Sequence, residues 1–207
     1  MKKNLIFDFD GVLGDTYEQG LDVRMVVNDY KNLDEARADA QNYFTKKPNH
    51  TRNHTLTREE LQKSYEWVKR YGELLHEKGF GLFDNFIEEI KRLKEVNKAV
   101  VSTGSQIYVL PAMAKVDTEF THILAYEDHH SKEEKIELVC RDWGVPLDDV
   151  YYFTDTLADV YELRDLLHKD KLIGVTWGYC TKEQLLTELP PQNILDTPED
   201  LAKIVGV

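Results

Sequence analysis

The chain has 207 residues, a length typical of one domain or of one domain with a modest insertion. It carries 26 Lys and Arg residues against 38 Asp and Glu residues, which gives a net charge of −12. Because proteins that bind nucleic acid polymers rely on basic surfaces, this balance argues against such a partner. It does not exclude a small anionic substrate, which one local cation cluster or a metal ion can hold.

The sequence also argues against export and membrane insertion. No window approaches the roughly 18 apolar residues of a membrane-spanning helix. Asp8 interrupts the first apolar run too early for a secretory signal peptide. The two cysteines, Cys140 and Cys180, are too few for a disulfide framework or a zinc site, and we expect reduced thiols. These features predict a cytoplasmic protein.

The first apolar run, Asn4–Phe9, leads directly into two carboxylates. Asp8 and Asp10 lie two residues apart and are followed by Gly11. Side chains two apart on a strand point to the same side, and active sites of open α/β sheets lie beyond the carboxyl ends of the strands. An alternative interpretation is that the aspartates only cap the following turn, since Asp-Gly is a turn signal.

A long helical segment, Tyr17–Lys78, separates this strand from the next. A crossover between parallel strands needs only about a dozen residues. We therefore expect residues 16–80 to form a cap of three or four helices over the carboxyl edge of the sheet, inserted into an α/β core of residues 1–15 and 81–207. The apolar residues that mark the helices are Leu21, Met25 and Val26; Leu33, Ala36, Ala40 and Phe44; and Leu61, Tyr65, Val68, Tyr71 and Leu75.

Other residues of the expected cap carry weaker signals. Arg24 lies on a different face of the first helix from Leu21 and is a candidate substrate contact. The aromatic residues are interpreted mainly as packing residues between helices; they are Tyr30, Tyr43, Phe44, Tyr65, Trp67 and Tyr71. A basic stretch is compatible with a solvated loop or with a clamp for a substrate anion; it comprises Lys46, Lys47, His50, Arg52, His54 and Arg58.

Four further short apolar runs, several rich in Val, Ile, Phe and Tyr, predict buried parallel strands. They are Lys98–Ser102, His122–Tyr126, Val150–Thr154 and Lys171–Trp177. Helical patterns separate them and follow the last one, beginning after Asp84 and at Ser131, Leu157, Thr181 and Thr197. The helix that begins at Leu157 is expected to end at His168. Strands that alternate with helices predict an α/β fold, a doubly wound parallel sheet with helices on both faces.

Polar residues gather where the later strands end. The second strand ends in Ser102 and is followed by Thr103, and Asp155 and Asp159 follow the fourth. Lys132 opens the helix that precedes the fourth strand. Carboxylates without a set of thiol or imidazole ligands suit a hard ion such as Mg²⁺, and without a cation they would repel one another.

In this order, the motifs resemble those of the haloacid dehalogenase-like superfamily of hydrolases, most of whose members are Mg²⁺-dependent phosphatases. The matching stretches are Phe7–Leu13, Val100–Ser102, Lys132, and Thr154–Thr156 with Asp159. The resemblance covers essentially the whole chain, and the helical insertion is similar to the family's helical cap. Thr154 stands where most relatives have Gly. The second motif also fits on Thr103 and the third on Lys135, although we favour Ser102 and Lys132.

The resemblance implies a Mg²⁺-dependent phosphatase that hydrolyses a small phosphorylated metabolite. Asp8 would attack phosphorus and form an aspartyl-phosphate, and Asp10 would protonate the leaving oxygen and then deprotonate water. Mg²⁺ would be held by Asp8, Asp155 and the backbone carbonyl of Asp10. Asp159 would bind the metal through water or orient Lys132.

The same resemblance implies a phosphate site. Ser102 would donate a hydrogen bond to a phosphoryl oxygen, and Lys132 would balance the charge of Asp8 and the phosphate. Gly11 and Thr103 would lie in the same phosphate site. Because the dehalogenase branch lacks the second aspartate, Asp10 favours cleavage of phosphate esters.

Two other functions remain open from the sequence. A phosphosugar mutase of the same family would use the same aspartyl-phosphate but return the phosphoryl group to its substrate. A catalytically silent binding protein would keep the fold without the reaction. The sequence does not predict the oligomeric state.

Overall fold

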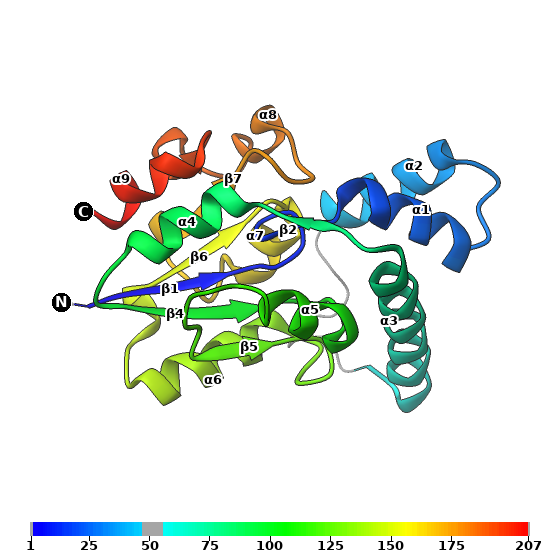
Figure 1. Cartoon of the computed structure of the whole chain (residues 1–207), viewed down its shortest axis with the longest axis horizontal. Coiled ribbons are helices and arrows are strands. Elements are labelled where there is room, and N and C mark those ends of the chain that lie inside the picture. Colours follow the sequence, from blue (N-terminus) through cyan, green and yellow to red (C-terminus); the bar gives the residue numbers. More distant parts are fainter. Residues whose placement is uncertain (1, 47–55, 207) are drawn as a thin grey trace.

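A parallel sheet of six strands forms the centre of the molecule (Figure 1). The structure, a computed structural model, describes residues 2–46 and 56–206. The strand order is β5-β4-β1-β6-β7-β8, and every pairing is parallel. The strands are β1 Lys3–Phe7, β4 Val96–Val101, β5 His122–Leu124, β6 Val150–Thr154, β7 Leu172–Val175 and β8 Ile194–Leu195.

Strand β1 lies between β4 and β6, so the chain builds the sheet outward from β1 in one direction and then in the other. This is a topological switch point, where loops leave in opposite directions and open a crevice at the carboxyl ends of the strands. The segments after β1, β4 and β6, which the sequence analysis singled out, are therefore neighbours in space.

Helices cover both faces of the sheet, as predicted. Leu5 and Phe7 belong to one hydrophobic cluster and Ile6 to the other, because alternate side chains of a strand point to opposite faces. On the first face lie α4 Asp84–Arg92, α5 Gln106–Met113 and α9 Leu201–Val205. On the second face lie α6 Lys132–Trp143, α7 Leu157–Leu163 and α8 Lys182–Leu185. The doubly wound α/β fold is confirmed.

Aromatic contacts fix β1 against its neighbours. The Phe7 ring stacks on Phe153 of β6 with 4.7 Å between centroids and meets Phe86 of α4 edge-on at 5.9 Å. Both arrangements are favourable for aromatic pairs. Because Asp8 follows Phe7 directly, this packing also fixes the backbone that carries Asp8.

Between the two short strands β2 and β3, three helices of the described chain lie beyond the carboxyl ends of the sheet strands (Figure 1). They are α1 Tyr17–Val27, α2 Leu33–Phe44 and α3 Arg58–Lys78. Helix α1 contacts α2 and α3, while α3 contacts α5 and α2 contacts α7. A short antiparallel pair, β2 Gly14–Asp15 and β3 Gly81–Leu82, joins the start and the end of the segment.

Local sequence explains how these helices begin. Thr57 and Glu60 form the predicted capping box of α3, and Asn32 accepts a hydrogen bond from the Glu35 backbone N–H (3.0 Å) at the start of α2. The packing faces differ in part from the prediction. The prediction that Val26, Leu61 and Tyr65 pack between helices was wrong, because these three side chains are exposed. A helix at the outside of a small bundle buries only a narrow stripe of its surface.

Some elements were not predicted. Strands β2, β3 and β8 have two residues each, which is too short for a hydrophobic period to appear. Helix α5 contains Pro111, a residue that usually argues against a helix. Helix α7 ends at Leu163, earlier than the predicted end at His168.

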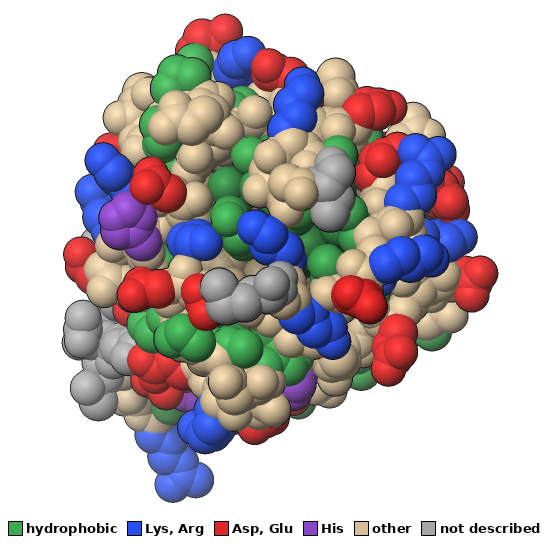
Figure 2. All heavy atoms as spheres, turned by 90° about the vertical axis from the view of Figure 1, so that its left-hand side faces the viewer, with side chains coloured by type: hydrophobic (Ala, Val, Ile, Leu, Met, Phe, Trp, Pro, Cys, Tyr) green, Lys and Arg blue, Asp and Glu red, His purple; other side chains and the backbone are tan. Residues whose placement is uncertain are grey.

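The remaining general predictions concern thiols, membranes and surface charge. Cys140 and Cys180 are free and buried. None of the described helices combines the length and apolar character needed to cross a bilayer. At the end of the molecule opposite α1–α3, basic and acidic side chains are intermixed (Figure 2), so this face has no field of a single sign.

We expect Phe7→Ala to lower the free energy of unfolding by about 3–5 kcal/mol, because it removes a fully buried ring from both stacked and edge-on contacts. Urea denaturation followed by circular dichroism measures this loss. Leu110→Ala is the control, since Leu110 is 40% exposed and should change stability by less than about 1 kcal/mol. Equal losses in the two variants would contradict the assigned core.

Candidate active site

Asp8 lies at the switch point, immediately after β1. Its backbone N–H donates to the Phe153 carbonyl (2.9 Å), which extends the pairing of β1 with β6. Its side chain is almost fully buried, with Oδ1 accepting from the Phe9 backbone N–H (2.7 Å). The alternative that the aspartates only cap the turn therefore accounts for one oxygen of Asp8. It does not account for Asp10, whose carboxylate accepts hydrogen bonds from other side chains.

Lys132 is the cation of the site. Its side chain rises from the first turn of α6, and its Nζ lies 2.8 Å from Asp8 Oδ2 and 2.6 Å from Asp159 Oδ2. Lys132 is 1% exposed, and both carboxylates are nearly as buried. Asp159 also accepts from the Thr154 hydroxyl (2.7 Å) and the Tyr152 hydroxyl (3.2 Å). One ammonium is therefore shared by two buried carboxylates.

The pKa values follow from this sharing. Burial alone would lower the pKa of Lys132, but Asp159 and Asp8 outweigh it and raise that pKa well above its usual value. Burial would raise the pKa of Asp159, but Lys132 and the hydrogen bonds hold it below its usual value. Burial raises the pKa of Asp8 despite Lys132, with repulsion from Asp159 and Asp155 adding to it. The ion pair of Lys132 with Asp159 is thus stronger than its ion pair with Asp8.

Asp155 follows β6 and is completely buried, and only one of its two carboxylate oxygens has a hydrogen-bond partner among the described residues. Its Oδ2 accepts from the Tyr179 backbone N–H (2.7 Å), while its Oδ1 has no hydrogen-bond partner in the described part of the chain. Burial raises the pKa of Asp155 to about 7. A buried carboxylate oxygen without a donor is costly, and a cation beside it would remove that cost.

Glycines make the room around Asp155. Gly11 has φ of +73°, a conformation that favours glycine, and a Cβ there would lie 1.9 Å from Asp155 Oδ2. A Cβ at Gly178 would lie 2.3 Å from the same oxygen. The backbone of two loops therefore encloses this carboxylate so closely that no side chain fits, and Gly11 belongs to the wall of the site.

Asp10 takes its hydrogen bonds from the helical segments. Its Oδ1 accepts from the Thr16 hydroxyl (2.8 Å), just before α1, and its Oδ2 from the Tyr108 hydroxyl of α5 (2.6 Å). A Cβ at Gly104 would lie 1.9 Å from the Tyr108 hydroxyl oxygen, so glycine is needed there. Burial raises the pKa of Asp10, and the bonds from Tyr108 and Thr16 partly offset that rise.

The described residues contain no cluster of three His, Cys, Asp or Glu side chains arranged to hold a metal ion. The predicted magnesium site does not require one, because it uses two carboxylates, Asp8 and Asp155, and the backbone carbonyl of Asp10. Asp159 is held by Lys132 and Thr154 instead. The unpartnered Asp155 Oδ1 fits a hard cation that prefers oxygen ligands.

The loop after β4 separates the two hydroxyl candidates. Thr103 lines the cavity above Asp8, whereas Ser102 is fully buried and its Oγ accepts from the Gly104 backbone N–H (2.9 Å). Lys135, the other lysine considered, contacts the Ser102 and Ala125 carbonyls (2.5 and 3.1 Å), and burial lowers its pKa to about 7. Lys132 contacts Asp8, and Lys135 fixes the loop.

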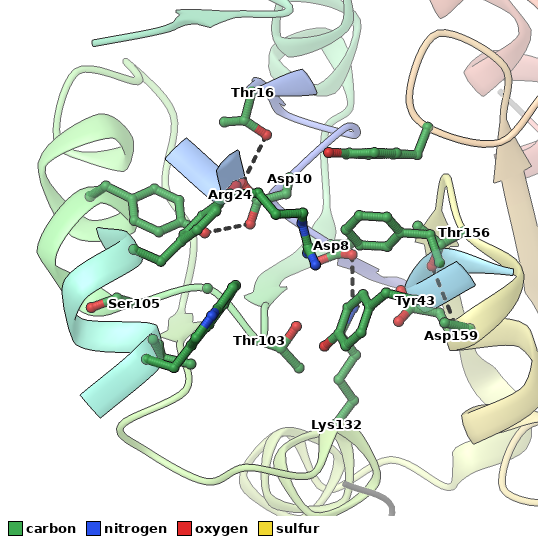
Figure 3. Close-up of a pocket in the computed structure, with 18 residues that line it drawn as sticks. Asp8, Asp10, Thr16, Arg24, Tyr43, Thr103, Ser105, Lys132, Thr156 and Asp159 are labelled. Atoms are coloured by element: carbon green, nitrogen blue, oxygen red, sulfur yellow. Dashed lines mark hydrogen bonds and ion pairs between the residues drawn. The ribbon is translucent and has the colours of Figure 1, made fainter. Parts of the chain in front are cut away.

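A cavity of about 80 Å³ lies above Asp8, Asp10, Lys132 and Asp159 (Figure 3). Side chains from α1, α2 and α3 form its far wall, including Arg24, whose contact with a substrate stays a prediction. Its aromatic lining residues are Tyr43, Phe44, Trp67, Tyr71, Tyr108 and Tyr179. Four aromatic residues of the cap segment thus line the cavity in addition to packing: Trp67 stacks on Tyr71 with 5.0 Å between centroids, and Tyr43 meets Phe44 edge-on at 5.0 Å. Tyr108 and Tyr179 carried no signal in the sequence, since neither lies in a motif.

The basic stretch between α2 and α3 falls mostly outside the described residues. Lys47, His50, Arg52 and His54 belong to residues 47–55, which the structure does not describe. The interpretation of this stretch as an anion clamp or a solvated loop therefore stays a prediction.

We expect Tyr108→Phe to raise the pKa of Asp10 further, because the phenol donates a hydrogen bond that stabilises the carboxylate. The pKa is read directly by ¹³C NMR titration of the aspartate carboxyls. Tyr126→Phe is the matched control, since that hydroxyl donates to Ser64 Oγ (2.7 Å). A lower or unchanged pKa of Asp10 in Tyr108→Phe would contradict this assignment.

Comparison with known proteins gives the family. Residues 5–162, which include all of the acidic residues and the lysine described above, match the haloacid dehalogenase-like hydrolase family. No curated protein sequence matches the chain. Among solved structures, a candidate phosphoglycolate phosphatase from Lactobacillus delbrueckii subsp. bulgaricus is 21% identical with a TM-score of 0.72, and each chain is covered over 100% of its length.

Two further structures are similar over 100% of both chains. A predicted phosphatase from Clostridium acetobutylicum is 18% identical with a TM-score of 0.70. CbbY from Rhodobacter sphaeroides, solved in complex with phosphate, is 17% identical with a TM-score of 0.65. These structures share the fold, and the family match covers the strand ends that build the site. The chain belongs to the haloacid dehalogenase-like hydrolase family.

Proposed function

We propose that this hydrolase is a Mg²⁺-dependent phosphatase that acts on a small phosphorylated metabolite through an aspartyl-phosphate intermediate. The observation that carries the proposal is the buried position of Asp8 between Lys132 and the half-satisfied Asp155, in a cavity shared with Asp10. The family match and the similarity to structures named as phosphatases support the reaction class.

Asp8 is the proposed nucleophile. Burial strips water from its carboxylate, which makes the oxygen more reactive, and Lys132 at 2.8 Å favours the ionised form. The Asp8 carboxylate would attack phosphorus in line with the leaving oxygen. The P–O bond to the leaving group breaks as the bond to Asp8 forms, and water then cleaves the acyl phosphate.

Asp10 is the proposed acid and base. Burial raises its pKa, so its protonated form is available to donate to the leaving oxygen. The same carboxylate, once deprotonated, would accept a proton from the water that attacks the intermediate. Thr16 and Tyr108 hold both of its oxygens and so fix its orientation toward the cavity.

Asp8, Asp155 and the backbone carbonyl of Asp10 would hold Mg²⁺, and its charge would offset the repulsion between the nucleophile and the phosphate. We propose that Asp159 orients Lys132, because Lys132, Thr154 and Tyr152 all donate to it. Thr154, which replaces the family's usual glycine, thus supports Asp159 through its hydroxyl.

The proposed phosphate site combines a cation with hydroxyls and backbone. Lys132 and Thr103 line the cavity, and Gly11 leaves the backbone close to Asp155. Ser102 Oγ accepts from Gly104, which leaves its hydrogen free to donate toward a phosphoryl oxygen. We also propose that residues 16–80 act as a cap on a core of residues 1–15 and 81–207, since α1, α2 and α3 supply the far wall of the cavity.

We expect release of inorganic phosphate from a panel of small phosphate monoesters, with loss of activity in EDTA and a fall of at least roughly 1000-fold in Asp8→Asn. Asp15→Asn is the matched control, because Asp15 is exposed and lies on β2, seven positions after Asp8. Turnover by Asp8→Asn at the wild-type rate would exclude Asp8 as the nucleophile.

The same assay separates the alternative functions. A phosphosugar mutase would isomerise a sugar phosphate and depend on a bisphosphorylated sugar, without net release of phosphate. A silent binding protein would neither release phosphate nor bind Mg²⁺.

We expect Asp155→Asn to stabilise the metal-free protein above pH 7, because the ionised Asp155 is buried with one oxygen unpartnered. Since its folded pKa lies above its usual value, the cost of wild-type Asp155 grows as pH rises toward 7 and is absent in acid. Thermal melts at pH 5 and pH 8 measure this. MgCl₂ should raise the melting temperature of wild type but not of Asp155→Asn; an equal rise in both would remove Asp155 from the metal site.

A further inference from the structure

Arg24 is a buried cation that the proposed reaction does not use. It lies on α1, is 6% exposed, and lines the same cavity as Asp8 and Lys132. The guanidinium carbon lies 5.3, 5.6 and 5.4 Å from the ring centroids of Tyr43, Phe44 and Trp67, so three aromatic faces surround it. Figure 3 shows Arg24 pointing from α1 into the cavity above Asp8.

The donors of Arg24 are only partly used. NH1 donates to Asp39 Oδ2 at 2.6 Å, while Nε is buried and has no partner in the described part of the chain. Burial would lower the pKa of Arg24, but the hydrogen bond to Asp39 and the charge interactions with Tyr71, Tyr179 and Asp39 together outweigh it and raise that pKa. The guanidinium is therefore charged, and a buried donor of a charged group without an acceptor is costly.

The catalytic carboxylates do not supply the missing acceptor. Both oxygens of Asp10 accept from Thr16 and Tyr108, and Asp8 is engaged by Lys132 and Phe9. Arg24 also borders a second, outer cavity of about 380 Å³ that Asp8 and Asp10 do not line. Arg24 thus lies on the wall that the two cavities share, and it faces Asp8 across the first of them.

We propose that Arg24 binds a carboxylate of the substrate's leaving group, so that the preferred substrates are phosphate monoesters of small hydroxy acids. This inference rests on the proposed phosphatase function. With NH1 held by Asp39, the Nε edge of the guanidinium is the one that faces an acceptor, and this edge matches the two oxygens of a planar carboxylate.

The surrounding groups make this contact selective. Tyr43, Phe44 and Trp67 exclude water from the guanidinium, and a charged hydrogen bond is stronger where water is excluded. A neutral leaving group of the same size would leave the Nε donor unpaired, which is how a buried polar group rejects a substrate that lacks its partner.

Two matched esters test the inference: 2-phosphoglycolate and 2-hydroxyethyl phosphate, which differ in a carboxylate against a hydroxymethyl group. Wild type should prefer 2-phosphoglycolate in kcat/KM, and Arg24→Gln should reduce that preference by roughly 10- to 100-fold, the range expected from losing a charged hydrogen-bonded pair. Arg24→Lys keeps the charge but not the paired N–H donors of the guanidinium, so it should lose most of the preference. Arg37→Gln is the control, because Arg37 on α2 is partly exposed and pairs with Asp34 outside the cavity.

The outcomes separate the two proposals. Turnover of both esters with no preference, or a preference that survives Arg24→Gln, overturns the role of Arg24 and leaves the phosphatase intact. Absence of turnover on any monoester overturns the phosphatase proposal. In that case, calorimetric titration of the two esters into Asp8→Asn protein still tests the contact with Arg24. Tighter binding of 2-phosphoglycolate that disappears when Arg24→Gln is added supports the contact. Equal binding of both esters overturns it.

Discussion

The site depends on one buried ammonium, Lys132 Nζ, which lies within 2.8 Å of Asp8 and 2.6 Å of Asp159. Two ionised carboxylates at this depth would repel each other and favour protonation. Lys132 removes that repulsion for the pair but cannot reach far enough to satisfy Asp155, whose Oδ1 has no partner among the described residues. The acidic excess that remains is local to the switch point beside β1, which is where the proposed Mg²⁺ would lie.

The rest of the fold holds these charges in place. Phe7 is locked between Phe153 and Phe86, so the residue that follows it, Asp8, has a fixed backbone. Lys132 reaches the site from the first turn of α6, and its own backbone N–H donates to Glu162 Oε1 of α7 (2.8 Å). The charged cluster is thus tied to three different segments that only the parallel sheet brings together.

This explains which parts of the site could be predicted. Asp8, Asp10, Asp155 and Lys132 follow or precede strands, and in a parallel sheet the strand ends meet at one edge whatever the loops do. Their grouping was therefore visible in the order of strands and polar residues. The aromatic wall was not, because Tyr71 and its neighbours show the same periodicity whether a helix packs on another helix or over a cavity. The angle at which α1–α3 meet the sheet decides between these, and no local pattern encodes it.

The two sides of the cavity place opposite demands on a ligand. On the sheet side, Asp155 Oδ1 is a buried acceptor without a donor, and on the helical side, Arg24 Nε is a buried donor without an acceptor. Each atom alone would destabilise the empty protein, because buried polar groups in folded proteins are nearly always paired. Together they are complementary to one kind of occupant: a cation at the strand ends and an anion extending from it toward α1. A metal-bound phosphate ester with an acidic leaving group has this arrangement of charge. Under the two proposals, binding of such a ligand would pair both atoms and recover the stability that each unpaired atom costs. The proposed substrate preference and the proposed metal site would then have the same electrostatic origin.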